Sequence, residues 1–306
     1  MPMFSEEALS LIWFVLLWGI FASYLVLDGF DFGVGIAYIF GSEEEKRSMR
    51  QAIGPFWDGN ETWLVLFAGV LFAAFPIAYG NILSHYYIFV FLLLFSLIFR
   101  GASLEFRSMV TSPMLRRFWD VAFWLPSMLI PVIFGIVGSD LALSKLSGTV
   151  DEAMHSVLVC ICLLSLLTLH GMNFLRLKGV AFTKLNQIAH VSGILFIISW
   201  LWVATIAPFT HPLMGVPIVF ISCFAAFMWW GKNNIVQFML SWLAVMLIVA
   251  GFALLIYPAI GVTGELTVYN TMSSDATLSR MLLFTVLGLP LVCAYTYLSY
   301  RIFWKN

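Results

Sequence analysis

The stretch LDGFDFGVG, residues 27–35, places two carboxyl groups, Asp28 and Asp31, inside the first long hydrophobic segment of the chain. A second polar stretch, GPFWDGNETW, residues 54–63, stands at the start of the next hydrophobic segment and carries Asp58 and Glu61. A carboxylate at the centre of a membrane helix costs about 2.5–3.5 kcal/mol even on a lenient insertion scale. Four such residues in two short motifs therefore predict a function inside the membrane.

The composition is that of an integral membrane protein. Of the 306 residues, 62% are hydrophobic and 10% are charged, and the mean hydropathy is +0.98. Soluble domains carry about 25% charged residues. The net charge of −1 gives no sign of a nucleic-acid partner, and we expect none. No basic residue precedes Lys46, so the first segment lacks the basic region of a signal peptide and is expected to remain as a membrane helix.

Nine stretches are long and apolar enough to cross a membrane, for which about 20 apolar residues are needed. They cover residues 8–38, 60–79, 84–104, 118–138, 154–174, 187–207, 213–231, 234–257 and 281–303. The connections are too short for a soluble domain. We therefore predict an all-α polytopic protein with a single integral membrane domain over residues 1–306. Its expected parts are two four-helix bundles, about 8–138 and 154–257, and one peripheral helix, about 281–303.

The basic residues predict the orientation of these spans. If the spans alternate in direction, 13 of the 15 Lys and Arg residues fall on one side, and only Lys145 and Arg280 fall on the other. Because basic residues are enriched in cytoplasmic loops, we expect the N-terminus outside and the C-terminus in the cytoplasm. A wrong number of spans would scramble this pattern, so the charges support the number nine.

Glycine and proline indicate where the spans pack closely or bend. Gly29 and Gly33 form a Gly-x-x-x-Gly pair, which lets helices approach one another closely. Prolines able to bend the spans 118–138, 234–257 and 281–303 are Pro126, Pro131, Pro258 and Pro290.

Six polar residues are expected at a similar depth, in the cytoplasmic half of the first four spans. They are Asp28, Asp31, Asp58, Glu61, Arg100 and Asp120. Asp28 and Asp31 are three residues apart and share a helix face, as do Asp58 and Glu61. Both pairs are expected to face the interior of the protein, because exposure to lipid is costly.

Arg100 is the single base at this depth that lies clearly within a span, and one guanidinium cannot neutralise five acids. Some of the carboxyl groups are therefore expected to be protonated, hydrated or both, as a proton path requires. Two interpretations stay open. An ion pair of Arg100 with Asp31 or Asp120 could simply lock the helices together. Asp58 and Glu61 have no base left, which favours a role in proton transfer.

Two other functions fit parts of the sequence. His170 and His190 lie on neighbouring spans and could ligate a haem iron, as in a self-contained b-type cytochrome. Interhelical hydrogen bonding is the other interpretation of these histidines. A proton-coupled transporter also places acids within membrane helices, but these acids lie in one half of the chain only. The four cysteines lie in apolar runs without a zinc or redox motif, and we expect no metal site.

Several motifs resemble those of subunit II of the cytochrome bd-type quinol oxidases. They are DGFDFGVG (28–35), WDGNETWL (57–64, which includes Trp57, Asn60 and Trp63), Phe99-Arg100 followed by EFRS (105–108), and Trp119-Asp120. Their order and spacing match the family, as do the nine spans. The motifs cover about residues 20–120, and the rest of the chain resembles the family mainly in topology.

This resemblance implies the non-haem subunit of an electrogenic, non-pumping quinol:dioxygen oxidoreductase. The implied partner is subunit I, which forms the heterodimer, oxidises quinol and carries haem b558, haem b595 and haem d. The complex reduces dioxygen to water with protons from the cytoplasm. We therefore expect a respiratory-chain protein of the bacterial or archaeal cytoplasmic membrane, to which single-helix accessory subunits or a structural quinone could be added.

The resemblance also implies roles for individual residues. Asp58 matches an Asp of a proton channel at the subunit boundary. Glu61 stands where some members have Gln and would add a second protonatable group, so both residues are expected to form the proton path. The positions that match residues needed for an intact haem-bearing assembly are Asp31, Arg100 and Asp120. The expected structural polar cluster comprises Asp28, Asp31, Arg100 and Asp120.

Overall fold

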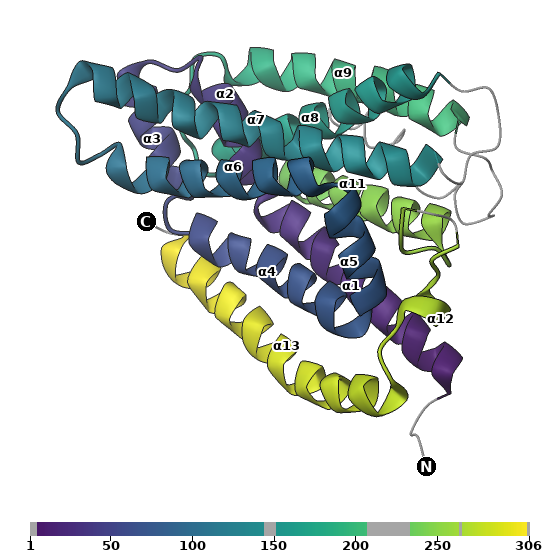
Figure 1. Cartoon of the computed structure of the whole chain (residues 1–306). Helices are drawn as coiled ribbons and strands as arrows, with labels where there is room; N and C mark the ends of the chain where they lie inside the picture. Colours follow the sequence, from purple (N-terminus) through teal and green to yellow (C-terminus); the bar gives the residue numbers. More distant parts are fainter. Residues whose placement is uncertain (1–4, 144–150, 207–232, 263–264, 305–306) are drawn as a thin grey trace.

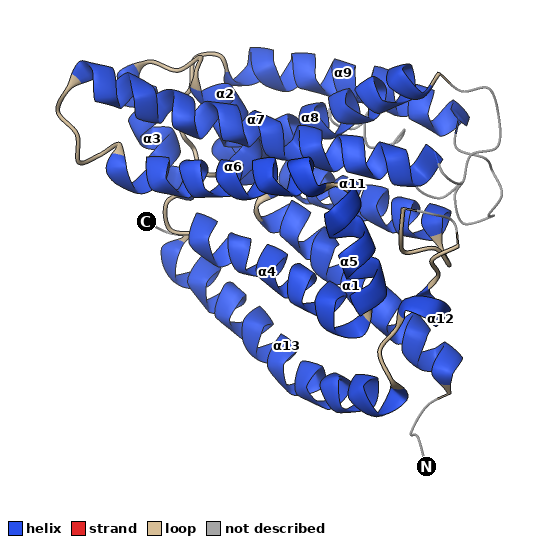
Figure 2. Cartoon of the chain, viewed as in Figure 1, coloured by secondary structure: helices blue, strands red, loops and turns tan. Residues whose placement is uncertain are grey.

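A computed structural model describes residues 5–143, 151–206, 233–262 and 265–304. In these ranges the chain is built of helices joined by loops (Figure 2). The helices are α1 (Glu6–Leu27), α2 (Gly29–Tyr38), α3 (Glu43–Ile53), α4 (Trp57–Ala74), α5 (Pro76–His85), α6 (Tyr87–Phe106), α7 (Pro113–Leu143), α8 (Glu152–Leu177), α9 (Leu185–Ile206), α11 (Asn234–Ile256), α12 (Val268–Thr271) and α13 (Asp275–Phe303). Across the described residues, strand pairing is limited to an isolated bridge between Ala259 and Thr267. The predicted all-α class is confirmed.

The described ranges contain seven spans of sufficient length and hydropathy, or eight if the bent pair α4–α5 counts as one. One of the seven is the continuous 33-residue span made by α1 and α2. Eight of the nine predicted spans thus have a counterpart. The predicted span 213–231 lies outside the described residues, so the number nine and the division into two bundles stay predictions.

The predicted span 60–79 is two helices instead of one. α4 ends at Ala74, α5 begins at Pro76, and the two are bent by 119° relative to each other. Phe75 between them has φ −130° and ψ 61°, since a residue before proline is pushed out of the helical region. Figure 1 shows α5 turning from the end of α4 back toward α6.

The prolines considered in the sequence have two different effects. α7 runs through Pro126 and Pro131 as one helix, and α13 runs through Pro290. α11 ends at Ile256, before Pro258. Proline lacks the backbone N–H that bonds within a helix interior. Pro258 follows the end of α11 by two residues, so it lies where that helix no longer needs the bond.

α13 lies at the edge of the molecule, along the outer side of α4 (Figure 1). Tyr300 of α13 donates a hydrogen bond to Asn60 of α4, and Trp63 of α4 donates one to Thr296 of α13. In the most apolar 18-residue stretch of this helix, only 6% of the residues are buried within the chain. The apolar side chains of α13 are therefore left for lipid or another membrane protein, and the peripheral helix expected over residues 281–303 stays a prediction.

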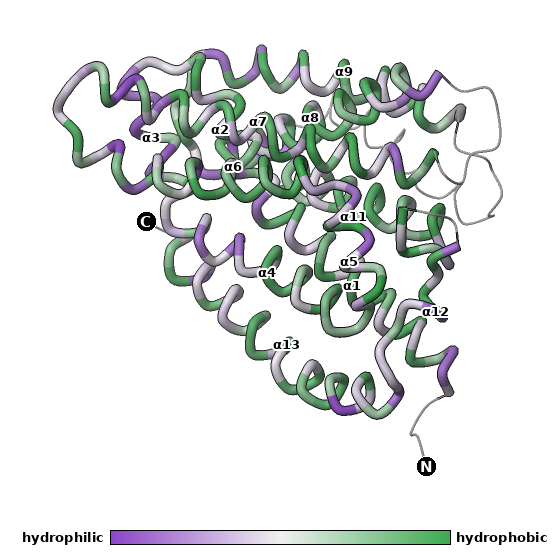
Figure 3. Tube along the Cα trace, viewed as in Figure 1, coloured by the Kyte–Doolittle hydropathy of each residue, from purple (hydrophilic) through white to green (hydrophobic). Residues whose placement is uncertain are grey.

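Polar residues gather on α3 and the neighbouring connections, as Figure 3 shows. Ser42 and Glu45 form a capping box at the start of α3. Glu45 also accepts hydrogen bonds from the hydroxyl and backbone N–H of Thr183, at 2.5 and 2.7 Å. These bonds lower the pKa of Glu45 to about 2. They tie α3 to the connection between α8 and α9, and we call this end of the molecule the α3 end.

The Gly-x-x-x-Gly pair brings α2 into backbone contact with α8. A Cβ atom at Gly33 would lie 2.0 Å from the carbonyl oxygen of Leu167, and one at Gly171 would lie 2.5 Å from backbone atoms of Gly33 and Val34. A Cβ at Gly29 would lie 2.8 Å from the Leu167 side chain. Backbone atoms cannot move aside in a close-packed interior, so the predicted close approach is confirmed.

Gly33→Ala is therefore expected to destabilise the protein by about 1–3 kcal/mol, the usual cost of overpacking, because the methyl group forces α2 away from α8. Gly19→Ala on α1 is the matched control, since no atom lies within 4 Å of its added Cβ. It should be neutral or slightly stabilising, because alanine favours the helix. Thermal unfolding of the purified protein measures both, and equal midpoints would contradict the backbone contact.

Candidate functional site

The first polar cluster centres on Arg100 of α6, which is fully buried. Its Nη2 donates to one carboxylate oxygen of Asp28, and its Nη1 donates to the other at 3.0 Å. Nη1 also donates to Glu61 Oε1 at 2.9 Å, and the guanidinium carbon lies 4.6 Å from the centre of the Phe32 ring. The bidentate pair with Asp28 joins α6 to the junction of α1 and α2.

Asp31 forms the other side of this cluster and is also fully buried. The side-chain amide of Asn60 donates to Asp31 Oδ2 at 2.9 Å and to the carbonyl of Leu27 at 2.8 Å. Arg100 Nη2 lies 3.7 Å from the same Asp31 oxygen. The hydroxyl of Tyr300 donates to Asn60 Oδ1 at 2.9 Å. Asn60 thereby links α13 to the buried acids. We call Asp28, Asp31, Asn60, Glu61 and Arg100 the Arg100 cluster.

The first turn of α4 carries Asp58 at the surface of the chain. Trp57 beside it packs on α6, where its ring lies 3.0 Å from the position of a Cβ at Gly101. Glu61 follows one turn later; 23% of its side chain is exposed, and it reaches the fully buried Arg100. Two carboxyl groups therefore lead from the surface to the buried guanidinium.

A second cluster surrounds Asp120 at the α3 end. Asp120 Oδ1 accepts hydrogen bonds from the hydroxyl of Tyr38 at 2.6 Å and from Arg107 Nε at 2.9 Å. Asp120 Oδ2 accepts one from Lys46 Nζ at 3.2 Å. Arg50 donates to the Tyr38 hydroxyl and lies 3.9 Å from Asp120 Oδ1. The Asp120 cluster, as we name it, comprises Tyr38, Glu43, Lys46, Arg50, Arg107 and Asp120.

The structure therefore separates residues that the sequence predicted as one cluster. The predicted lock of Asp31, Arg100 and Asp120 is wrong in its third member, because Asp120 pairs with Arg107. Glu61 was expected to have no base left, but it pairs with Arg100. The spacing of the two arginines could have predicted the role of Arg107. Arg107 follows Arg100 by seven residues, about two helical turns, and so lies on nearly the same face of the helix.

The Arg100 cluster contains more acid than base. Asp28, Asp31 and Glu61 share one guanidinium, and no other base among the described residues pairs with them. An uncompensated buried charge costs several kcal/mol, so a proton on at least one of these carboxyl groups is favoured. The pairs also mean that removing Arg100 would strand its carboxylate partners in an apolar interior.

The histidines do not form a common ligand site. His170 is fully buried; its Nδ1 lies 2.7 Å from the hydroxyl of Ser241 and its Nε2 lies 3.1 Å from the carbonyl of Val26. Both ring nitrogens are thus engaged between helices and do not fit an axial haem ligand. His190 is exposed on α9. Within the described ranges, no three His, Cys, Asp or Glu side chains are grouped to hold a metal ion.

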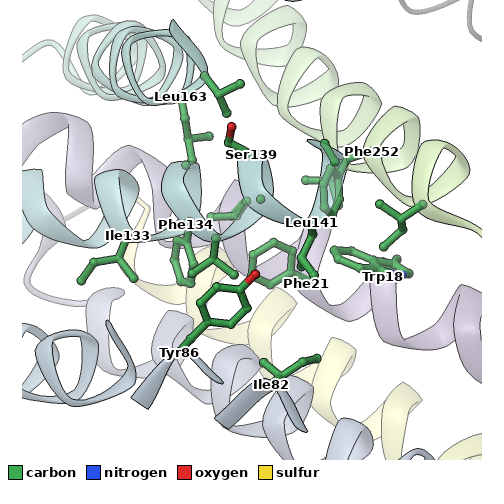
Figure 4. A pocket seen from close by; sticks show the side chains of 18 of the residues that line it. Trp18, Phe21, Ile82, Tyr86, Ile133, Phe134, Ser139, Leu141, Leu163 and Phe252 are labelled. Atoms are coloured by element: carbon green, nitrogen blue, oxygen red, sulfur yellow. The ribbon is translucent and has the colours of Figure 1, made fainter. Parts of the chain in front are cut away.

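A largely apolar cavity of about 520 Å³ lies among α1, α4–α9 and α11. Figure 4 shows Trp18, Phe21 and Phe134 around it, together with the hydroxyl groups of Tyr86 and Ser139. Tyr86 donates a hydrogen bond to Asp140 at 2.6 Å, and the Ser139 hydroxyl lies 2.8 Å from Nδ1 of His155. The cavity therefore offers a long apolar wall with a few polar groups.

The helices and the Arg100 cluster define a class: a polytopic membrane protein that keeps an acid-rich ionic cluster between its spans. The chain belongs to the cytochrome bd terminal oxidase subunit II family, whose model matches residues 9–303. It is thus a multi-pass membrane subunit of a bacterial terminal oxidase, and family membership implies a partner subunit I.

The relatives agree with this assignment. The chain is 29% identical to cytochrome bd ubiquinol oxidase subunit 2 of Bacillus subtilis (strain 168), over 96% of each chain. It is 34% identical to cytochrome bd-I ubiquinol oxidase subunit 2 of Escherichia coli (strain K12), over 50% of this chain and 41% of that one. Its fold matches a chain in the structure of bd oxidase from Geobacillus thermodenitrificans with a TM-score of 0.73, 17% identity, and 98% and 99% coverage.

Arg100→Gln is expected to lower the stability of the purified complex by about 3–5 kcal/mol, because it leaves buried carboxylates without their partner. Arg117→Gln, an exposed position on α7, is the control and should change stability little. Denaturant or thermal unfolding, together with the yield of intact complex, checks the difference. Similar values for both variants would show that the Arg100 cluster does not hold the helices together.

Proposed function

We propose that this chain is the haem-free subunit of a quinol oxidase and passes protons toward the oxygen-reducing site of subunit I. In this proposal, subunit I holds haem b558, haem b595 and haem d, oxidises quinol and reduces dioxygen to water without pumping protons. The haems, where bound, supply electron transfer and oxygen binding. The bonded ring nitrogens of His170 support a haem-free role for this chain.

The observation that carries the proposal is the series from Asp58 through Glu61 to Arg100. Asp58 is exposed and can exchange a proton with its surroundings. Glu61 lies one turn deeper and bonds Arg100 Nη1 when ionised. A proton that arrives on Glu61 removes its charge, and Arg100 keeps its bidentate pair with Asp28. The excess of acid over base lets the cluster take up and release a proton without leaving the guanidinium unpaired.

The surface on either side of α4 supports a partner at the outer end of this series. The exposed apolar side chains of α6 include Phe91, Leu94, Phe95, Ile98 and Phe99. Those of α13 include Leu283, Phe284, Leu287, Leu291 and Tyr295. A subunit I seated on both helices would cover these residues, which otherwise face lipid, and would bring its own polar groups to Asp58.

The orientation follows the charges. The proposal places the α3 end in the cytoplasm, the N-terminus outside and the C-terminus inside, because basic residues are enriched in cytoplasmic loops. In this orientation Asp58 receives protons from the cytoplasmic side, which is the side from which an electrogenic, non-pumping oxidase must draw them. Small single-helix accessory subunits stay a prediction.

Asp58→Asn tests the proton path. It is expected to slow quinol-dependent oxygen uptake on the order of a hundredfold, the low end of what a positioned proton-transfer group contributes. The haem spectrum and yield of the complex should stay normal, because the side chain of Asp58 is exposed at the surface of the chain. Oxygen uptake and optical spectra of the same preparation measure both effects.

The control for this variant is Glu152→Gln, an exposed acid in the first turn of α8. It removes the same charge away from the series and should leave oxygen uptake unchanged. Full uptake with Asp58→Asn would remove Asp58 from the path. An equal loss in both variants would show that only surface charge matters.

We also propose that the apolar cavity holds an isoprenoid quinone as a structural ligand. A quinone pairs a long apolar tail with a ring that bears two carbonyl oxygens. The apolar wall suits the tail, and the few polar groups that line the cavity, among them the hydroxyl groups of Tyr86 and Ser139, suit the more polar ring. This role is separate from quinol oxidation in subunit I.

Gly138→Leu is expected to reduce the quinone that co-purifies with the complex. Gly138 lines the cavity, and its added Cβ would meet only the Phe252 ring at 3.9 Å, so the side chain fits and fills space. Gly193→Leu, with no atom within 4 Å of its Cβ, is the control. Solvent extraction and chromatography count quinone per complex. Equal quinone in both variants would exclude this cavity.

A further inference from the structure

The basic residues at the α3 end have different partners in the two halves of the chain. In the first half, Lys46, Arg50 and Arg107 each lie within ion-pair distance of Asp120, and Arg107 also pairs with Glu43 at 2.5 Å. In the second half, the sequence contains neither Asp nor Glu from residue 153 to residue 264. The bases of that half therefore need another source of negative charge.

Arg176, near the end of α8, is held by neutral oxygen atoms. Its Nη1 donates to Gln237 Oε1 at 2.6 Å and to Asn173 Oδ1 at 3.1 Å, and its Nη2 donates to Asn186 Oδ1 at 3.0 Å. These amides come from α11, α8 and α9, so the guanidinium is fixed where three helices meet. An amide oxygen orients a guanidinium but carries no net charge. Arg176 therefore keeps its whole positive charge.

Lys178, the C-terminal cap of α8, lies in a similar setting. Its Nζ donates to the carbonyl oxygens of Trp304 at 2.8 Å and Phe303 at 3.4 Å, at the end of α13. It also lies over the rings of Trp304 and Phe56, 5.0 and 5.4 Å from their centres. Carbonyl dipoles and rings offset only part of an ammonium charge. Burial lowers the pKa of Lys178, whereas a neighbouring carboxylate would raise it.

Neither Arg176 nor Lys178 forms an ion pair with any residue in the part of the chain that the structure describes. Two fixed positive charges thus stand two residues apart at the end of a membrane span. A guanidinium group matches both carboxylate and phosphate in geometry and charge, and no carboxylate of the described residues pairs with Arg176. At this depth the phosphate groups belong to the lipid headgroups.

An apolar strip continues from this site along α11. Ile235, Met239 and Trp242 are exposed there by 58%, 52% and 38%. Their spacing of four and three residues places them on one helix face. The strip begins beside Asn234, whose side chain donates to the carbonyl oxygen of Arg176 at 3.4 Å. It is therefore positioned to carry an acyl chain below a headgroup held by Arg176.

The geometry points to a binding site for an anionic phospholipid, with its headgroup phosphate on Arg176 and an acyl chain along Ile235, Met239 and Trp242. Lys178 adds a second positive charge at the same end of α8. The lipid supplies the negative charge that the second half of the chain lacks. Helices α8, α9 and α11 would then be joined at the α3 end by a lipid, where the first half uses Asp120. This inference does not depend on the proton path.

The test uses the complete, delipidated complex with phosphatidylglycerol as the probe and phosphatidylcholine as the zwitterionic comparison. Native mass spectrometry counts lipid bound at increasing lipid concentration. We expect phosphatidylglycerol to be preferred in the unmodified complex. The double variant Arg176→Gln with Lys178→Gln should weaken its binding about tenfold or more, from the contribution of each basic residue near an anionic headgroup.

The charge-matched control is the double variant Arg47→Gln with Arg117→Gln, which removes two exposed bases, one on α3 and one on α7. It should keep the preference. Lys178→Gln alone provides a milder variant if the double change lowers the yield of complex. Equal binding of the two lipids, equal loss in both double variants, or displacement of lipid by millimolar inorganic phosphate as effectively as by phosphatidylglycerol would overturn the site.

Discussion

The structure depends on one buried guanidinium. Arg100 has no exposed surface, and it is surrounded by the carboxyl groups of Asp28, Asp31 and Glu61. A charge in an apolar interior is tolerated only with partners at hydrogen-bond distance. That requirement sets where α6, α4 and the junction of α1 and α2 stand relative to one another. The same cluster is also the place where an acid can change its protonation state, since the acids outnumber the base.

The other contacts of the first half follow from this arrangement. Asn60 and Glu61 are neighbours on α4, and they reach Asp31 and Arg100 respectively. Tyr300 then joins α13 to Asn60, which brings that helix to its place beside α4. At the α3 end, Asp120 pairs with three bases from two segments of the chain, Lys46 and Arg50 on α3 and Arg107 at the end of α6. The two clusters therefore fasten the helices at two depths, and only the first lies beside the surface residue Asp58.

Much of the fold was predictable because hydropathy and charge act along the chain. Eight of the nine spans have a described counterpart, and the close approach at Gly33 was expected from its spacing to Gly29. The break at Phe75 was missed, although Pro76 is its cause. The pairing of the acids was missed in part. The sequence predicted a similar depth for Asp120 and Arg100, but Asp120 meets Arg107, which lies on nearly the same face of α6 about two turns further along.

The sequence by itself determined the membrane class, the family, and the set of acids and bases available between the spans, because these follow from composition and from motifs within single segments. The tertiary structure alone decided which charges neutralise one another. It pairs Arg100 with Asp28 and Glu61, and it leaves Arg176 with amide oxygens from three helices. The physical reason is that an ionic interaction depends on a few ångströms between side chains, and only helix packing sets that distance.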